Sequence, residues 1–453
     1  MSNLYDKIKD TSYCYFAMHS FSVHAHGRSR MCCVSRDTSN TYLEGSKNNI
    51  TLNDILKNKK YQIANDLDTF VNDKKLMEVR AEMLKGNRPE SCQRCWNLEE
   101  NGIKSFRQIQ NTTFENFINK DLSHVSVDGK IDPAEIKYLD ITLGNVCNLK
   151  CRSCNPWNSH RWIEEGPHVP HANWEKSTYN TGRLSSENPW FVKAFEEGLF
   201  DDILPNINAI NFLGGEPLVV QEHYDWLEKI IDKGYSKHIN LFYNTNATTL
   251  PKRLFNIWEK YKTVNLGISI DAISDLAYYV RHPSKWNVIE NNIKKLAEHS
   301  KTHKNIYVQT HVTLSVLNLH DLPNIINWCK KNYDEWHYEF MQGNRYWGNY
   351  GYQNCLPHFN VVEYPSWMHI RHLPDNIKEQ LSIMIDSQVE ILNSWNLKHW
   401  EKVSIQNIQG IKSAMNAERD ASEWQKFIEN TIASDKFRNL DIRDYVDWMK
   451  DYI

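Results

Sequence analysis

The sequence predicts an α/β fold in which short strands alternate with helices. Six runs rich in aliphatic, aromatic and β-branched residues recur along the middle of the chain, at 138–143, 209–213, 239–243, 263–270, 306–316 and 336–341. Between them lie stretches in which apolar residues recur at helical spacing, for example Tyr224, Leu227, Ile230 and Ile231 before Gly234. Six βα units in series are expected to close partly into a (β/α)6 TIM-type barrel, with the functional groups at the carboxyl ends of the strands.

Several of these strands alternate polar with aliphatic residues. In the fifth run, Gln309, His311 and Thr313 alternate with Val308 and Val312. A parallel strand covered on both faces should instead be apolar on both. The alternation indicates a polar interior able to hold a ligand, or else edge strands with one wetted face.

Length and composition narrow the class of protein. The chain has 453 residues and a formal net charge of −3, which does not favour a nucleic-acid-binding surface. No apolar run reaches the length of a membrane span, and the first residues lack the apolar core of a signal peptide, so we expect a cytoplasmic protein. Ten cysteines gathered in short motifs then indicate metal binding rather than disulfides.

Three domains are expected. A small α+β, cysteine-bearing module spans 1–135, the partial barrel spans 136–345, and a helical C-terminal extension spans 346–453. The extension shows no catalytic motif. Cys355, in the loop 343–359 that precedes its helices, is either a bystander thiol or a hydrogen-atom donor or extra cluster ligand near the active site.

One loop carries the main chemical signal. Directly after the first strand, Cys147, Cys151 and Cys154 follow a Cys-x3-Cys-x2-Cys pattern. Three thiolates on one loop can hold three corners of a 4Fe–4S cluster and leave the fourth iron open. A structural zinc ion needs four ligands, and no fourth is near in the sequence, although zinc and unliganded thiols stay possible at this point.

A second cysteine set lies upstream. Cys14 and Cys32 flank Gly27, and Cys92 and Cys95 form a Cys-x2-Cys turn, with an amphipathic helix expected between the two pairs at 74–85. Four thiolates satisfy either a 4Fe–4S cluster or zinc. The adjacent Cys33 is an alternative to Cys32.

Polar residues at the ends of later strands could bind a ligand. Gly214, Gly215 and Glu216 end the second strand, where glycines permit close backbone approach and a carboxylate can accept hydrogen bonds from an ammonium group. Alone, such a triplet is more often an ordinary turn.

The cysteine loop together with the Gly-Gly-Glu turn resembles the radical S-adenosylmethionine (radical SAM) enzymes. The resemblance implies that Cys147, Cys151 and Cys154 hold a 4Fe–4S cluster whose open iron binds SAM. It also assigns cofactor contacts at later strand ends, namely Gly214, Gly215, Glu216, Asn246, Ser269, Asp271 and Arg281. Ser153 stands where the family usually has an aromatic residue before the third cysteine.

The upstream set resembles the twitch module, a half-size relative of the SPASM domain. This resemblance implies an auxiliary 4Fe–4S cluster on Cys14, Cys32, Cys92 and Cys95. In most relatives the module follows the barrel, whereas here it precedes it.

The two resemblances imply a radical SAM oxidoreductase or transferase. It would cleave SAM reductively to a 5′-deoxyadenosyl radical that abstracts hydrogen from a substrate, with flavodoxin or ferredoxin as electron donor. A peptide is the first expected substrate; a nucleoside, sugar or other small molecule is the second. Two other classes stay open, a zinc-binding structural or interaction protein and a SAM-independent electron carrier.

Overall fold

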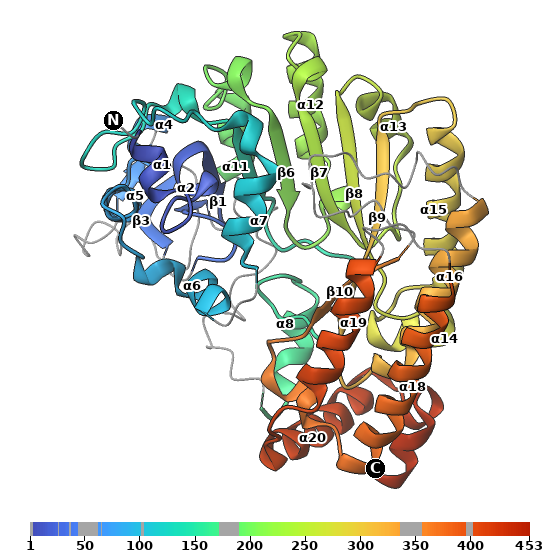
Figure 1. The fold of residues 1–453 in the computed structure, drawn as a ribbon. Coiled ribbons are helices and arrows are strands. Elements are labelled where there is room, and N and C mark those ends of the chain that lie inside the picture. The colour runs from blue at the N-terminus through green and yellow to red at the C-terminus, as the bar shows by residue number, and fades with distance from the viewer. Residues whose placement is uncertain are drawn as a thin grey trace.

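The computed structural model describes residues 3–25, 27–35, 38–43, 62–64, 66–100, 104–171, 190–335, 356–395 and 402–453. One curved sheet forms the centre of the molecule, with helices on its outside (Figure 1). Its ten strands lie in the order β10-β9-β8-β7-β6-β5-β1-β2-β3-β4. Their bounds are β1 (Ser20–Val23), β2 (Arg28–Arg30), β3 (Thr38–Leu43), β4 (Gln62–Ala64), β5 (Tyr138–Thr142), β6 (Ala209–Leu213), β7 (Asn240–Thr245), β8 (Thr263–Ser269), β9 (Ile306–Leu314) and β10 (His358–Val361).

The strands β5 to β9 confirm five of the six strands expected from the sequence, each within about two residues of its expected bounds. Each is parallel to the next, which is the arrangement expected of βα units in series. The sixth expected strand, 336–341, lies outside the described residues. The described strand beside β9 is β10, which is parallel to it and pairs His358 with His311.

The N-terminal segment extends this sheet. Strand β1 is parallel to β5, with Ser22 opposite Asp140, and antiparallel to β2. The turn between β1 and β2 contains Gly27 at a φ of +72°, a conformation that glycine adopts without steric cost. The cysteine-bearing segment and the barrel therefore share backbone hydrogen bonds.

The helices follow the expected alternation. Helix α5 starts at Asp73, whose carboxylate accepts a hydrogen bond from Lys75 N, and stops before Gly86, whose φ is +86°. The α-helices are α1 (Leu4–Ile8), α2 (Tyr15–His19), α4 (Leu67–Val71), α5 (Lys74–Leu84), α6 (Gln93–Glu100), α7 (Phe106–Thr113), α8 (Trp162–Glu165), α11 (Trp190–Glu196), α12 (Glu222–Asp232), α13 (Lys252–Trp258), α14 (Ser274–Val280), α15 (Trp286–Ser300), α16 (Leu322–Glu335), α18 (Asp375–Ser394), α19 (Lys402–Met415) and α20 (Ala421–Arg438).

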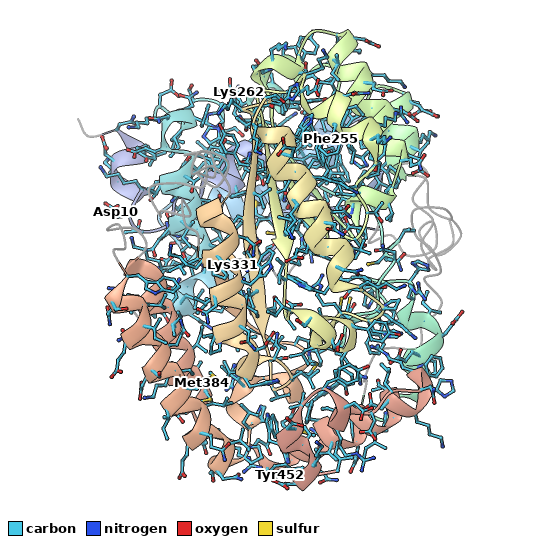
Figure 2. The ribbon with its side chains drawn as sticks, turned by 90° about the vertical axis from the view of Figure 1, so that its right-hand side faces the viewer. Asp10, Phe255, Lys262, Lys331, Met384 and Tyr452 are labelled. Carbon is cyan, nitrogen blue, oxygen red and sulfur yellow. The ribbon has the colours of Figure 1, made fainter. Side chains whose placement is uncertain are left out.

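The two ends of the barrel are occupied by different parts of the chain. Helices α18 and α20 lie at the end toward which the parallel strands point, and α20 lies beside α8 (Figure 1). Figure 2 shows Lys262, which precedes β8, near one end, and Tyr452, after the last long helix, at the opposite end. No described helix is long and apolar enough to cross a membrane.

Strand β9 confirms the expected alternation. Its aliphatic residues, such as Val308 and Val312, are buried, whereas Gln309, His311 and Thr313 are half-buried. One face of the strand is therefore apolar and the other polar, as period-two alternation requires. The polar face continues through the sheet, where the Asp140 carboxylate accepts hydrogen bonds from Asn211 Nδ2 at 2.9 Å and from Ser22 Oγ at 3.1 Å.

Candidate functional site

The cysteine loop, residues 144–156, leaves the carboxyl end of β5 and is held closed by hydrogen bonds. The Asn145 amide donates to Pro156 O at 2.9 Å, and the Ser159 hydroxyl donates to Leu149 O at 2.6 Å. The loop backbone also pairs with the segment after α14 through two N–H donors, Lys150 N to His282 O and Arg152 N to Val280 O. The loop is therefore fixed from both sides.

The thiols of Cys147, Cys151 and Cys154 lie close enough in this loop to act on one another's pKa. Burial first, and then the charge of Cys151, raises the pKa of Cys147 to about 12. Burial and both neighbouring thiols likewise raise the pKa of Cys154. Cys147 is buried and Cys151 and Cys154 are half-buried. Three thiolates on this loop would need a cation to compensate their charge, so the donor set fits a metal centre.

The two glycines after β6 pack against the backbone of the cysteine loop. Gly214 has a φ of +139°, and Gly215 N donates to Gly144 O at 3.2 Å. A Cβ on Gly215 would lie 2.4 Å from Val146 O. The sequence predicted that these glycines let a ligand come close to the backbone. In the structure, the backbone of the cysteine loop lies against them.

We expect Gly215→Ala to displace the cysteine loop and to reduce the iron that the chain retains. The added methyl would clash with rigid backbone at Val146, and such overpacking costs about 1–3 kcal/mol of stability. Denaturant unfolding and iron per chain measure both effects. Gly410→Ala in helix α19 is the matched control. A Cβ there would meet no other atom within 4 Å, so we expect unchanged iron and about 1 kcal/mol more stability. Equal iron in both variants would contradict this role for Gly215.

Glu216 follows the glycines and is buried, with 1% of its surface exposed. Its carboxylate accepts hydrogen bonds from Thr245 Oγ1 at 2.7 Å, Asn246 N at 2.6 Å and Leu218 N at 3.1 Å. Burial raises the pKa of Glu216, although these three donors act in the opposite direction. The carboxylate therefore ties the end of β6 to the end of β7.

Asn246 links the end of β7 to the cysteine loop. Its amide donates to Asn148 Oδ1 at 2.9 Å, and its own Oδ1 accepts from Thr248 N and Thr248 Oγ1 at 2.9 and 2.6 Å. Glu216, Asn246 and the cysteine loop consequently form one hydrogen-bonded unit.

Arg281 and Asp271 meet on the other side of the cysteines. Arg281 Nη1 lies 2.5 Å from Asp271 Oδ2, and Asp271 Oδ1 accepts from Thr313 N at 2.8 Å. Burial alone would lower the pKa of Arg281, but Cys151 and Asp271 outweigh it and raise that pKa. Arg281 Nε is buried without a hydrogen-bond partner. Ser269 ends β8, two residues before Asp271.

A buried ion-pair network, which the sequence analysis missed, connects the cysteine loop to the C-terminal helices. Arg438 Nε lies 2.8 Å from both oxygens of Glu165, and Lys150 Nζ lies 3.0 Å from Glu165 Oε2. The side chains of Glu165 and Arg438 are fully buried, with 0% exposed. Of these three residues, only Lys150 could be linked to the site from the sequence, because it stands next to Cys151.

A second such pair lies beside the first. Arg152 pairs with Asp435 of α20, and its guanidinium lies 3.9 Å from the centre of the Tyr279 ring. The Tyr279 hydroxyl donates to Asp435 Oδ1 at 3.0 Å. Together the two ion pairs make α20 a wall of the candidate site.

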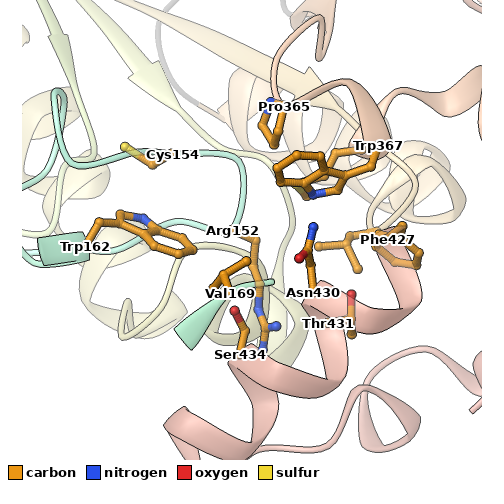
Figure 3. A pocket seen from close by; sticks show the side chains of 12 residues that line it. Arg152, Cys154, Trp162, Val169, Pro365, Trp367, Phe427, Asn430, Thr431 and Ser434 are labelled. Atoms are coloured by element: carbon orange, nitrogen blue, oxygen red, sulfur yellow. The ribbon is translucent and has the colours of Figure 1, made fainter. Parts of the chain in front are cut away.

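A pocket opens between this wall and the cysteine loop (Figure 3). Cys154 and Trp162 lie on one side, and Trp367 and Asn430 lie across from them. Asn430 is 5% exposed, and its Nδ2 has no hydrogen-bond partner among the described residues. The pocket is therefore lined by aromatic rings and by the amide donor of Asn430, and it borders Cys154.

The four N-terminal cysteines also come together. Burial first, and then Cys32, Cys92 and Cys95, raises the pKa of Cys14. The pKa of Cys92 is raised to about 12 by burial, followed by Cys32. The pKa of Cys33 is raised by burial and then by Asp140, so Cys33 borders the polar face of the sheet. Cys32 is therefore the better candidate for the fourth ligand.

The spacing of the thiols bears on which metal they suit. Within the part of the chain that the structure describes, no three cysteine sulfurs lie within 4.8 Å of one another. Four thiolates bound to one zinc ion at about 2.3 Å would lie only about 3.8 Å apart. A 4Fe–4S cluster binds each thiolate to a separate iron and holds them farther apart.

Comparison with known proteins finds one matching family. Residues 141–329 match the family model of the radical SAM superfamily. The family implies an enzyme with a 4Fe–4S cluster and SAM. The match runs from β5 to α16 and contains the cysteine loop and the Gly-Gly-Glu turn. No curated protein matches the chain.

Solved structures of radical SAM enzymes are similar at low identity. SuiB of Streptococcus suis bound to S-adenosylmethionine is 15% identical with a TM-score of 0.31, covering 58% of this chain and 49% of SuiB. Native anSMEcpe with bound AdoMet and Cp18Cys peptide is 15% identical with a TM-score of 0.33, covering 56% of this chain and 60% of that one. The chain thus spans about half to three fifths of the length of these proteins.

Proposed function

We propose that this protein is a radical SAM enzyme in which Cys147, Cys151 and Cys154 hold a 4Fe–4S cluster with one iron open for SAM. The observation that carries the proposal is the cysteine trio inside the residues that match the radical SAM family model. The nearby carboxylates support an open iron, because Glu216 already accepts three hydrogen bonds and Asp271 is paired with Arg281.

A reduced cluster held by Cys147, Cys151 and Cys154 would supply the electron for reductive cleavage of SAM to methionine and a 5′-deoxyadenosyl radical, which would take hydrogen from the substrate. The protein's own residues orient the reactants and exclude water. Glu216 and Asn246 fix the loop at the methionine side of SAM, and Gly214 and Gly215 hold the backbone there.

Ser269, Asp271 and Arg281 form the opposite side of the proposed SAM site. The free Nε of Arg281 is a donor for a carboxylate oxygen, and Ser269 and Asp271 can hydrogen-bond ribose hydroxyls. Arg281 also lies near Cys151 and so places positive charge beside a cluster that carries negative thiolates.

The second cysteine set is proposed to hold an auxiliary 4Fe–4S cluster on Cys14, Cys32, Cys92 and Cys95, as in twitch modules. The effect of Cys32, Cys92 and Cys95 on the pKa of Cys14 supports one shared metal site for the four thiols. An electron donor of the flavodoxin or ferredoxin type would reduce the enzyme.

A peptide is the proposed substrate, and a nucleoside, sugar or other small molecule is the alternative. The reason is the resemblance of the upstream module to those of peptide-modifying relatives. The polar face of the barrel, which includes the exposed Asn244 and the half-buried Gln309, offers hydrogen bonds to either class.

Anaerobic reconstitution tests the proposal directly. We expect about eight iron and eight sulfide per chain, and a brown absorbance bleached by dithionite, because two 4Fe–4S clusters are filled. With SAM and reductant, 5′-deoxyadenosine should form. A colourless protein with stoichiometric zinc would contradict the proposal, and iron without SAM cleavage would leave an electron carrier instead.

A further inference from the structure

Two histidines and a glutamate outside the proposed SAM site converge on a single point. Glu259 caps the carboxyl end of α13, His299 lies in the last turn of α15, and His303 lies just beyond it. The three ligand atoms all lie within 4.8 Å of one another, and this is the one group of three metal-ligating side chains so close among the described residues.

The spacing of these atoms matches a bound transition-metal ion. Glu259 Oε1 lies 3.4 Å from His299 Nε2 and 3.3 Å from His303 Nε2. Tetrahedral zinc with bonds of about 2.0–2.2 Å to nitrogen and oxygen places its ligand atoms about 3.3–3.5 Å apart. Two imidazoles and one carboxylate are a ligand set that suits zinc and its neighbours rather than calcium or magnesium.

Helix geometry brings the two rings together. His303 N donates to His299 O at 3.1 Å in the turn that follows α15, and this bond holds His303 one turn beyond His299. The two rings are stacked, with centres 4.3 Å apart and planes 11° apart. Because each Nε2 lone pair lies in the plane of its own ring, one ring must turn about its side-chain torsions for both to bind the same ion. The Phe255 ring, 4.4 Å from that of His299, supports the ring from α13.

A hydrogen bond to the other ring nitrogen prepares His303 as a ligand. Thr302 Oγ1 donates to His299 O at 3.1 Å and therefore accepts from His303 Nδ1, 2.9 Å away. The proton then sits on Nδ1 and the lone pair on Nε2, which is the tautomer a metal needs. His299 Nε2 is buried and makes no hydrogen bond, although it faces Glu259.

We propose that Glu259, His299 and His303 form a binding site for a divalent transition-metal ion such as Zn²⁺, with one coordination position left to water. The ion would join α13 to α15 at the amino ends of β8 and β9, the end of the barrel where Lys262 and Phe255 lie (Figure 2). The proposed SAM site lies at the other end, so this site is independent of the proposed function.

Zinc binding to the cluster-loaded protein tests the site. We expect the anaerobic protein to bind one Zn²⁺, measured by calorimetry, without losing iron. Glu259→Gln and His303→Ala should each weaken binding more than about tenfold, and Thr302→Val by about tenfold, because it removes only the partner of the ligand ring. X-ray absorption at the zinc edge should show nitrogen and oxygen neighbours without sulfur.

His171→Ala is the matched control. His171 Nε2 lies 2.5 Å from Glu429 Oε2, and no third ligand among the described residues completes this pair, so we expect zinc affinity to stay unchanged. Iron content and the Tm without zinc verify that each variant is folded. No zinc binding by the unaltered protein, sulfur at the zinc, or equal affinity in the folded Glu259 and His303 variants would overturn the proposal.

Discussion

Cys147→Ala is expected to reduce 5′-deoxyadenosine formation to the level of a blank without enzyme. The substitution removes one of three thiolates, and Cys151 and Cys154 alone cannot hold a cube that needs three corners bound. Iron should fall from about eight to about four per chain, because the N-terminal set keeps its own cluster. Iron analysis and 5′-deoxyadenosine formation with SAM and reductant measure the two effects.

Cys92→Ala provides the comparison. It should also lower iron to about four per chain, but it leaves the SAM-binding trio intact and should retain part of the SAM cleavage. Cys33→Ala should keep about eight iron, because Asp140 raises the pKa of Cys33 more than Cys32 does and Cys14, Cys92 and Cys95 are not among the causes. Equal loss of cleavage in the Cys147 and Cys92 variants would mean that the N-terminal set is not merely auxiliary.

Glu165→Ala is expected to destabilise the protein by about 3–5 kcal/mol, because it leaves two buried cations, Arg438 and Lys150, without their partner. Both members of the Glu165–Arg438 pair are fully buried, so water cannot replace the lost carboxylate. Glu228→Ala is the matched control: its partner Arg253 is 41% exposed, and the loss should stay below about 1 kcal/mol. Denaturant unfolding distinguishes the two results, and similar losses would contradict the buried network.

The pH dependence of stability gives this network a second signature. Burial alone would raise the pKa of Glu165, but Arg438 and Lys150 lower it below its ordinary value of 4.5. A carboxylate whose pKa is lower in the folded state contributes stability above its unfolded pKa and loses it as the pH falls through the folded value. The unaltered protein should therefore lose more stability below about pH 4.5 than Glu165→Gln does.

Much of the candidate site could be predicted from short stretches of sequence. The spacing of Cys147, Cys151 and Cys154 was sufficient because one loop brings them together whatever the rest of the chain does. The alternation along β9 was equally readable, since successive side chains of a strand point to opposite faces. The place of Glu216 followed from its position at a strand end.

Other features of the structure could not be predicted from neighbouring residues. The glycines at 214 and 215 were expected to approach a ligand, yet their immediate neighbour is the backbone of the cysteine loop. The parallel pairing of β1 with β5 joins segments more than a hundred residues apart, and no pattern in either strand predicts its partner.

The sequence by itself determined which atoms could hold a cluster and which strands would carry them, because spacing and periodicity are properties of neighbouring residues. Only the tertiary structure decided that Arg438 neutralises Glu165 across 273 positions, and that Glu259 meets His299 and His303. These contacts depend on how whole helices pack. The free energy of that packing comes from the entire chain, so the residues around either partner do not predict the contact.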